Sequence, residues 1–291
     1  MELADWRRHI EYVVETEGQW VGLGNSDGHP VMDLPGLIPP LTAPEQHLVG
    51  VDAEASFVVA PGSPLLERLG AEGLGVDQAG VLQPATGDVR LLLVVRPGRR
   101  LAYPITYVVI SGETAPSKLT IHAADLTTEL GLWPCPSVSI SWAGAEFQEF
   151  KTDASGIRYK TPHQLAWTEH ATRVLDFSKR GKAVTTLRDV CQESFDAVDQ
   201  AYGWTTPKFI TSYAGGDDTS PEVAVTFSDD TVWDTISEPA RQAGVTIRVH
   251  LWWPGDEPIV TRAGRDVLGT KTVAPDRPVL VVDIHQIDKE S

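Results

Sequence analysis

The nearest approach to a metal site in this sequence is a pair of histidines beside a carboxylate. His163 and His170 lie seven residues apart in a stretch predicted to form a helix from Thr161, and Glu169 precedes the second histidine. A zinc protease needs its histidines four residues apart, because that spacing brings both rings to one ion. The spacing here favours a solvated helix face, so we expect no metal site.

Two pairs of adjacent aspartates are the other candidates for metal binding or acid–base chemistry. Asp217-Asp218 lies in a glycine-rich loop, and Asp229-Asp230 lies just before a predicted helix. Neither pair has EF-hand spacing around it, which favours helix capping and loop solvation over a calcium site.

Glycine-rich segments provide no clear cofactor site. Residues 22–28 and 70–75 contain spaced glycines, but neither segment follows a clear strand and opens a helix, as a dinucleotide-binding turn does. The sequence has no phosphate loop and no G-x-S-x-G nucleophile elbow. We therefore expect no cofactor and assign no catalytic residue.

Arg96, Arg99 and Arg100 form a dense basic cluster in a turn between two predicted strands. One interpretation is a hairpin tip in water, and the other is a contact with an acidic surface of a neighbouring copy. Trp252, with His250, is predicted on the polar face of a later strand. An exposed tryptophan there would mark a subunit interface or a sugar-binding platform, whereas a covered core position is the alternative.

The composition excludes several classes of protein. A formal charge of −16 and a pI near 4.8 argue against nucleic-acid or anionic-lipid binding through a general basic field. The chain has no apolar run long enough to span a bilayer and no apolar core of a secretory signal, so we expect a protein made in the cytoplasm. Cys135 and Cys191 are expected to be two thiols, although a bridge between them is an open alternative.

The elements that would position these residues are clearest in residues 231–259. Thr231 and Asp234 predict a helix start, and Gly244 predicts its end, with a break expected near Ser237 because of Pro239. Alternation over residues 245–253 then predicts a half-buried strand, followed by a Pro-Gly-Asp turn at residues 254–256.

The remaining patterns predict an α+β protein made of two β-rich, barrel-like and mainly antiparallel units with a helical insertion. Near-continuous apolar runs in the first unit predict strands that are covered on both faces. The predicted segments are an N-terminal helix with a proline-rich extended arm at residues 1–45, a first β-rich unit at 46–136, a helical insertion at 137–203 and a second β-rich unit at 204–291.

Residues 231–259 also carry a family resemblance. The helix pattern W-x-x-I-x-x-P-A-x-x-A-G, the strand that ends in tryptophan and the PGD turn resemble minor tail proteins of actinobacterial (mycobacteriophage-type) siphophages, which form the central hub of the tail tip. The resemblance extends upstream to LLLVVRPGRRLAYPITYVVISG and KLTIHAADLTTELGLWPCP and downstream to RPVLVVDIHQID, over roughly residues 46–286. Members of that family are generally longer, so distal domains would be absent or lie on other chains.

The resemblance implies a non-enzymatic virion structural protein of the tail tip or baseplate, assembled in the host bacterial cytoplasm. It implies a homotrimer around the tail channel that contacts the distal tail protein and the tape measure protein. Asp217, Asp218, Asp229 and Asp230 would then face the channel, and the arginine turn with Trp252 would face a neighbouring subunit. The alternatives are a host carbohydrate- or receptor-binding tail module and a cell-wall hydrolase, which would need paired carboxylates.

Overall fold

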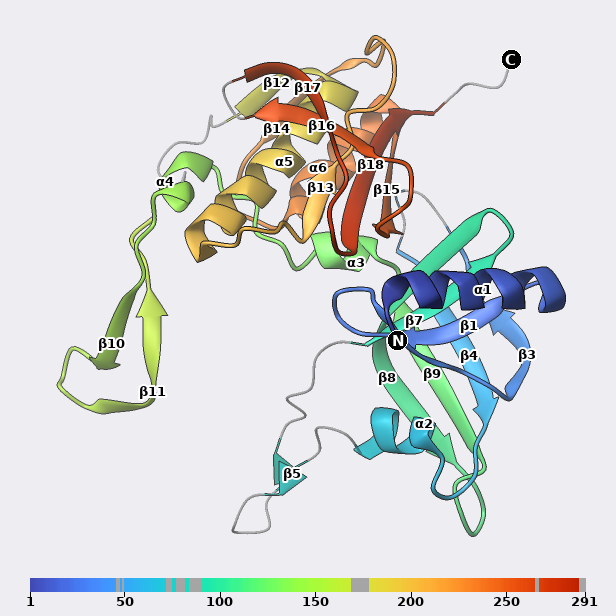
Figure 1. Cartoon of the computed structure of the whole chain (residues 1–291). Coiled ribbons are helices and arrows are strands. Elements are labelled where there is room, and N and C mark those ends of the chain that lie inside the picture. Colours follow the sequence, from blue (N-terminus) through green and yellow to red (C-terminus); the bar gives the residue numbers. More distant parts are fainter. Residues whose placement is uncertain are drawn as a thin grey trace. The chain divides into compact units, whose positions relative to one another are not determined.

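The structure is a computed structural model that describes residues 1–45, 48, 50–71, 75–76, 82–83, 90–168, 178–264 and 267–287 (Figure 1). The chain divides into two compact units, each built from three stretches of sequence. Unit 1 comprises residues 1–128, 248–258 and 274–281, and unit 2 comprises residues 129–247, 259–273 and 282–291. These bounds differ from the four segments predicted above, because both units recruit short stretches near the end of the chain.

Unit 1 consists of a seven-stranded sheet with an N-terminal helix and smaller elements. Its elements are α1 (Leu3–Glu17), β1 (Trp20–Gly24), β2 (Pro30–Asp33), β3 (Leu37–Thr42), β4 (Asp52–Val58), α2 (Pro64–Leu66), the π-helical turn η1 (Glu67–Ala71), β5 (Gly75–Val76), β6 (Leu82–Gln83), β7 (Leu91–Arg96), β8 (Arg99–Ser111) and β9 (Lys118–Ala124). The sheet order is β2-β1-β7-β8-β9-β4-β3, and its pairings are antiparallel.

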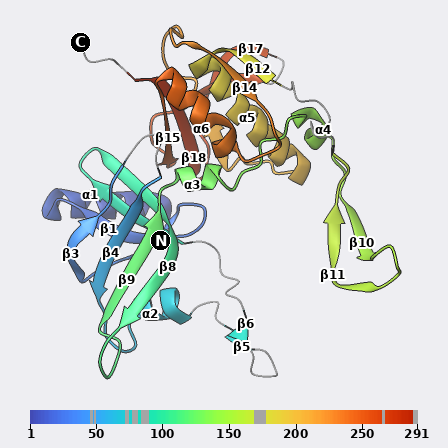
Figure 2. The same ribbon diagram turned by 180° about the vertical axis from the view of Figure 1, so that it is seen from behind.

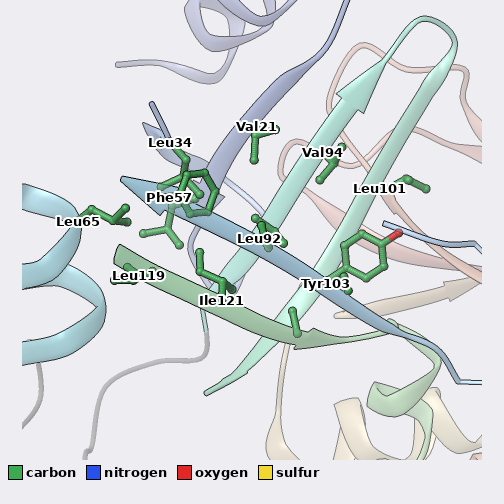
Figure 3. Packing of buried hydrophobic residues seen from close by; sticks show 14 of the residues in the cluster. Val21, Leu34, Phe57, Leu65, Leu92, Val94, Leu101, Tyr103, Leu119 and Ile121 are labelled. Atoms are coloured by element: carbon green, nitrogen blue, oxygen red, sulfur yellow. The ribbon is translucent and has the colours of Figure 1, made fainter. Parts of the chain in front are cut away.

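The core of unit 1 lies against one face of this sheet, which contributes residues from five of its strands (Figure 3). Leu92, Tyr103 and Ile121 from β7, β8 and β9 belong to this one cluster. On the opposite face, Trp6 of α1 packs against Trp20 of β1 with their ring centroids 6.1 Å apart. The first four residues of β7 and residues 101–104 of β8 are buried, which confirms strands covered on both faces there. The prediction is wrong for β9, where buried and partly exposed residues alternate, and for the second half of β8, which is mostly exposed.

The proline-rich arm is a correction to the sequence analysis. The segment from Met32 to Pro44 was expected to be extended and without strand pairing, but it contains the end of β2 and all of β3, the two edges of the sheet. Proline lacks a donor and is therefore tolerated on an edge strand. The pairing of β3 with β4 is irregular between Ile38 and Thr42, where Pro39 and Pro40 lie.

Unit 2 surrounds two helices with several small sheets. Its elements are α4 (Ser139–Ala143), β10 (Gln148–Thr152), β11 (Arg158–Leu165), β12 (Ser178–Lys182), α5 (Ala183–Tyr202), β13 (Phe209–Thr211), β14 (Glu222–Thr226), α6 (Val232–Ala243), β16 (Ile259–Gly264) and β17 (Val267–Val273). Three further elements carry residues of both units: α3 (Thr127–Leu130), β15 (Val245–Trp252) and β18 (Val279–Gln286). The small sheets are β10-β11, β12-β14, β16-β17 and β13-β18-β15.

The described elements confirm an α+β fold with mainly antiparallel strands. The helical insertion predicted at residues 137–203 contains one long helix among the described residues, α5, which buries Leu187, Val190 and Phe195 and ends at the left-handed Gly203. Phe195 and Phe209 stack with their ring centroids 4.8 Å apart, and Trp133 meets Phe209 edge-on at 5.0 Å. These aromatic rings form the centre of unit 2.

The helix predicted from Thr161 is wrong, because residues 158–165 form strand β11. The long helix α5 lies in the second half of the proposed insertion, and the first half contains the short helix α4 and the hairpin β10–β11 (Figure 2). The predicted apolar face relied on Trp167, which is 90% exposed, and on residues 171–175, which lie outside the described residues. Thr161 and Gln164 therefore do not act as a helix cap.

The predicted break at Pro239 is also wrong, since α6 continues from Val232 to Ala243 with Pro239 inside it. The helix is capped at both ends: Thr231 accepts a hydrogen bond from the backbone N–H of Asp234, and Gly244 adopts the left-handed conformation. Ile236 and Ala240 are fully buried. Packing and capping together offset the cost of the missing proline donor.

Candidate functional site

The PGD turn holds a carboxylate that connects three parts of unit 1. Asp256 accepts hydrogen bonds from both terminal nitrogens of Arg100, at 2.6 and 3.2 Å, and from Nη1 of Arg7 at 3.0 Å. It also accepts one from the backbone N–H of Trp253 at 2.8 Å. The carboxylate thus joins α1, the start of β8 and the turn after β15.

Arg100 is enclosed by the same turn. Its guanidinium lies 3.8 Å from the centroid of the Trp253 ring, and its Nη1 also donates to the carbonyl of Leu251 at 3.3 Å. The indole Nε1 of Trp253 donates to the carbonyl of Gly28 at 2.9 Å. A side chain at Gly28 would collide with Leu251, and Gly28 has a φ of +85°, so glycine is required at this position.

These contacts determine the protonation of Asp256. Burial of the carboxylate raises its pKa. The hydrogen bonds from Arg100 and from the Trp253 backbone, together with the charges of Arg100 and Arg7, lower the pKa by more than burial raises it. The net effect is a pKa below the ordinary value of 3.8, so Asp256 is ionised at neutral pH.

An open groove of about 530 Å³ lies next to this cluster within unit 1. It is lined by α1 residues Ile10, Glu11, Val14 and Glu15, by the β7–β8 turn from Val95 to Arg100, and by Arg248, His250, Leu251 and Asp256. Arg248 donates from Nε to Glu45 at 2.6 Å, and Arg99 lies 3.8 Å from the same carboxylate. The groove therefore combines apolar side chains with charges of both signs, and Arg99, Arg100 and Arg248 are used in ion pairs of the chain itself.

The three arginines of the predicted basic cluster do gather at this groove, but they are not equivalent. Arg99 is exposed, whereas Arg96 donates to Gln19 at 3.4 Å and Arg100 is enclosed as described. The interpretation of the whole cluster as a hairpin tip in water is therefore wrong for Arg100. Its partner is Asp256 of the same chain, far away in sequence.

Trp252 corrects a second expectation, because its side chain is only 3% exposed. Its indole Nε1 donates to the carbonyl of Glu257 at 2.8 Å. The alternation that predicted a polar position for Trp252 fails where the strand ends, and Leu251, Trp252 and Trp253 are all buried. A tryptophan in this environment does not provide an exposed sugar platform.

Two of the four predicted channel aspartates have structural roles in unit 2. Asp218 accepts hydrogen bonds from the N–H and hydroxyl of both Thr185 and Ser220, and so caps the start of α5. Burial raises its pKa, but these hydrogen bonds lower it below the ordinary value. Asp229 has a positive φ of 56° and accepts from the N–H and hydroxyl of Ser137.

The other two aspartates, Asp217 and Asp230, are exposed. Asp230 accepts a hydrogen bond from the N–H of Thr231 at 3.0 Å, which supports the start of α6. The expectation of helix capping at these pairs is therefore confirmed for Asp218, whereas the cap of α6 is Thr231.

Metal binding at the histidine pair rested on a helix that does not form. His163 lies on β11, where the ring of Tyr159 meets it edge-on at 4.3 Å, and both Glu169 and His170 lie outside the described residues. Among the residues that the structure describes, no group of three or more histidine, cysteine, aspartate or glutamate side chains could hold a metal ion.

The two cysteines are free and buried in unit 2. Cys135 accepts a hydrogen bond from the hydroxyl of Ser194 at 3.3 Å. Burial raises the pKa of both thiols above their ordinary value, so both are protonated at neutral pH. This environment fits cysteine as a small apolar residue of the core.

The exposed hairpin β10–β11 was not predicted, although the sequence contains a signal for its turn. Asp153 accepts hydrogen bonds from the N–H groups of Ser155 and Ile157, and Gly156 has a φ of +82°. An aspartate followed by serine and glycine is typical of such a turn.

No described helix of this chain is long and apolar enough to cross a membrane.

Comparison with known proteins gives a distant structural similarity to a phage tail protein. No protein-family model matches the chain, and no curated protein matches it either. In structure, the chain is similar to the 43 kDa tail protein of prophage MuSo2 from Shewanella oneidensis, with a TM-score of 0.35 and 12% sequence identity. The similarity covers 90% of this chain and 54% of the tail protein, so the chain spans about half of that protein's length. At this TM-score, the similarity carries neither fold nor function over to this chain.

Proposed function

We propose that this protein is a structural component of a phage tail, and more specifically a subunit of the tail-tip hub of a siphophage. The observation that carries the proposal is the sequence resemblance of residues 231–259 to minor tail proteins. The structure gives these positions architectural roles. Ile236, Ala240 and Ala243 are buried in α6, Gly244 ends the helix, and the aspartate of the PGD turn joins Arg7 and Arg100. A shared pattern at such positions supports a shared scaffold.

In this proposal the chain acts by assembling into the virion. We infer a homotrimer around the tail channel, with the distal tail protein and the tape measure protein as neighbours. A subunit that must keep its shape within an assembly benefits from long-range polar contacts such as Arg7–Asp256, which fix the order of the elements in unit 1.

A direct test is to locate the chain in virions of the phage that encodes it. Immunogold labelling should place the protein at the end of the tail away from the head, and deletion of its gene should give particles without a complete tail tip. Absence of the chain from purified virions would refute the proposal. Cell-wall cleavage by the purified chain that disappears when one carboxylate is replaced would instead establish a hydrolase.

The lining of the channel is a finer part of this proposal. Carboxylates that face the channel would repel the phosphates of passing DNA. Because Asp218 and Asp229 are partly buried and hydrogen-bonded within unit 2, we assign this role to the exposed Asp217 and Asp230. Replacing both with asparagine should leave assembly intact and slow DNA delivery, measured as potassium release or genome entry. Unchanged delivery by particles that carry both substitutions would contradict the assignment.

A further inference from the structure

The hairpin β10–β11 of unit 2 has no covered face. Every residue of both strands is exposed, and Figures 1 and 2 show the hairpin standing clear of α5 in the same unit. Two strands alone are marginally stable in water, because they bury little apolar surface. We therefore expect the hairpin to be stabilised by packing against another surface.

The hairpin exposes several large apolar side chains to solvent. Phe150, Ile157 and Leu165 are exposed, and so is Phe147 at its base. Phe150 lies directly across from His163, whose ring contacts Tyr159, so aromatic groups follow one side of the hairpin. Several exposed apolar side chains gathered on one small element mark it as an interaction surface.

The charge of the hairpin is opposite to that of the rest of the chain. Residues 148–165 contain three basic side chains, Lys151, Arg158 and Lys160, and two acidic ones, Glu149 and Asp153, so they carry +1. Since the whole chain carries −16, the remaining residues carry −17. Lys151 pairs with Glu149. Within the described part of the chain, Arg158 and Lys160 have no ion pair.

We propose that the hairpin β10–β11 docks on the acidic surface of a second copy of this chain. Arg158 and Lys160 alternate with Tyr159 along β11, so the strand presents basic groups on one side and an aromatic ring on the other. The second copy supplies carboxylates for Arg158 and Lys160. This inference deepens the proposed function by naming a contact between subunits, and it relies on that function only for its biological meaning.

Docking occurs through the faces of the hairpin and not through strand addition. Pro162 has no N–H to offer a new neighbouring strand, and lysines on an exposed strand oppose edge-to-edge pairing. Basic and aromatic side chains on the faces are therefore the groups that recognise the second copy, with electrostatic attraction guiding the encounter.

The test compares two charge reversals in the full chain. Arg158→Glu with Lys160→Glu changes the hairpin, and Arg180→Glu with Lys182→Glu is the matched control, because these residues are also exposed, basic and two apart on a strand of unit 2. Both variants have the same net charge. Self-association is measured by sedimentation equilibrium over a range of concentrations at low and high salt, with circular dichroism to verify folding.

We expect the wild-type chain to self-associate and the hairpin reversal to weaken the association at least tenfold, while the control remains within about twofold. High salt should also weaken the wild-type association at least tenfold, since screening shortens the reach of exposed charges. Phe150→Ser, which leaves the charge unchanged, should weaken it as well. A monomeric wild type, equal effects of the two reversals or a salt-independent association would overturn the proposal.

Failure of this proposal and failure of the tail function are distinguishable. The association is measured with the isolated chain, so its absence would leave the location of the chain in virions untouched. An associating chain that is absent from virions would refute only the tail function.

Discussion

Asp256 accepts hydrogen bonds from two arginines and one backbone N–H, so its removal leaves two guanidinium groups without their carboxylate. The side chains of Arg100 and Asp256 are only 19% and 23% exposed. We expect Asp256→Ala to lower the free energy of unfolding by about 3 kcal/mol, because a charge that loses its partner in a partly buried site is costly. Urea unfolding followed by tryptophan fluorescence measures the change.

The control for this substitution is Asp217→Ala, since Asp217 is exposed. Its effect should remain within about 0.5 kcal/mol. If both variants unfold at the same urea concentration, the Arg7–Asp256–Arg100 cluster does not stabilise unit 1.

The lowered pKa of Asp256 leads to a prediction about pH. Because the folded carboxyl has a pKa below 3.8, its contribution to stability is complete above 3.8 and is lost as pH falls through the lower folded value. The difference in melting temperature between the wild type and Asp256→Asn should therefore be constant near neutral pH and shrink below pH 3.8. Melting curves collected from neutral to strongly acidic pH measure this difference.

A difference that grows on acidification would contradict the assignment of Asp256 as the ionised partner. Asp218→Asn should show the same shrinking difference, because the pKa of Asp218 is also lowered.

At the scale of elements, β15 can be tested by two neighbouring substitutions. Val249 is 9% exposed, so Val249→Asp should cost at least about 3 kcal/mol of unfolding free energy. Alternation along β15 places Arg248 on the polar face, and the structure pairs it with Glu45 at 2.6 Å. We therefore expect a loss of about 1 kcal/mol, because two carboxylates would face each other. Chemical denaturation of both variants measures these losses.

The charge swap Glu45→Arg with Arg248→Glu provides the control for this ion pair. It should regain part of the stability lost in Arg248→Glu. A swap that is no more stable than the single variant would show that the Arg248–Glu45 contact contributes nothing.

Helix α6 allows a prediction of the opposite sign. Pro239 has no N–H to donate within the helix, so Pro239→Ala should raise the free energy of unfolding by roughly 1 kcal/mol. Ser237→Ala, in the same helix, should change it by less than about 0.5 kcal/mol. Thermal melting of both variants decides the question, and an unchanged or lower stability of Pro239→Ala would mean that the proline ring itself packs usefully.

The sequence was sufficient for elements with a strong local pattern. The apolar spacing of α5, the cap at Thr231 and the alternation of Val245, Ile247 and Val249 all correspond to observed elements. The same kind of local pattern gave a wrong prediction for residues 158–165, because Thr161, Pro162 and Gln164 have the composition of a helix cap although the segment is a strand. Pairing with β10 decided their structure, and such pairing is not a local property.

The candidate site was predictable only in part for the same reason. The pattern Pro254-Gly255-Asp256 indicates a turn, and the arginines of the β7–β8 turn indicate a charged surface. Their union required a contact between Arg100 and Asp256, which are 156 positions apart in the sequence. No spacing rule within one element connects residues at that distance.

At the scale of the whole molecule, the net charge of −16 overstates the acidic surface, because some carboxylates form contacts within the chain. Several carboxylates are used within the units: Asp256 and Glu45 in unit 1, and Asp218 and Asp229 in unit 2. The acidic surface available to a partner is therefore smaller than the net charge indicates. The hairpin β10–β11 is an exposed segment whose charge would complement it.

The assembly of unit 1 from residues 1–128, 248–258 and 274–281 affects how the protein emerges from the ribosome. Trp253 reaches Gly28 across 225 positions, and Asp256 reaches Arg7 across 249. During translation, the native partners of Arg7, Gly28 and Arg100 are therefore absent until nearly nine-tenths of the chain has been made. The nascent seven-stranded sheet must remain protected from aggregation for that interval, and a chain stopped shortly before residue 248 would lack both C-terminal stretches of unit 1.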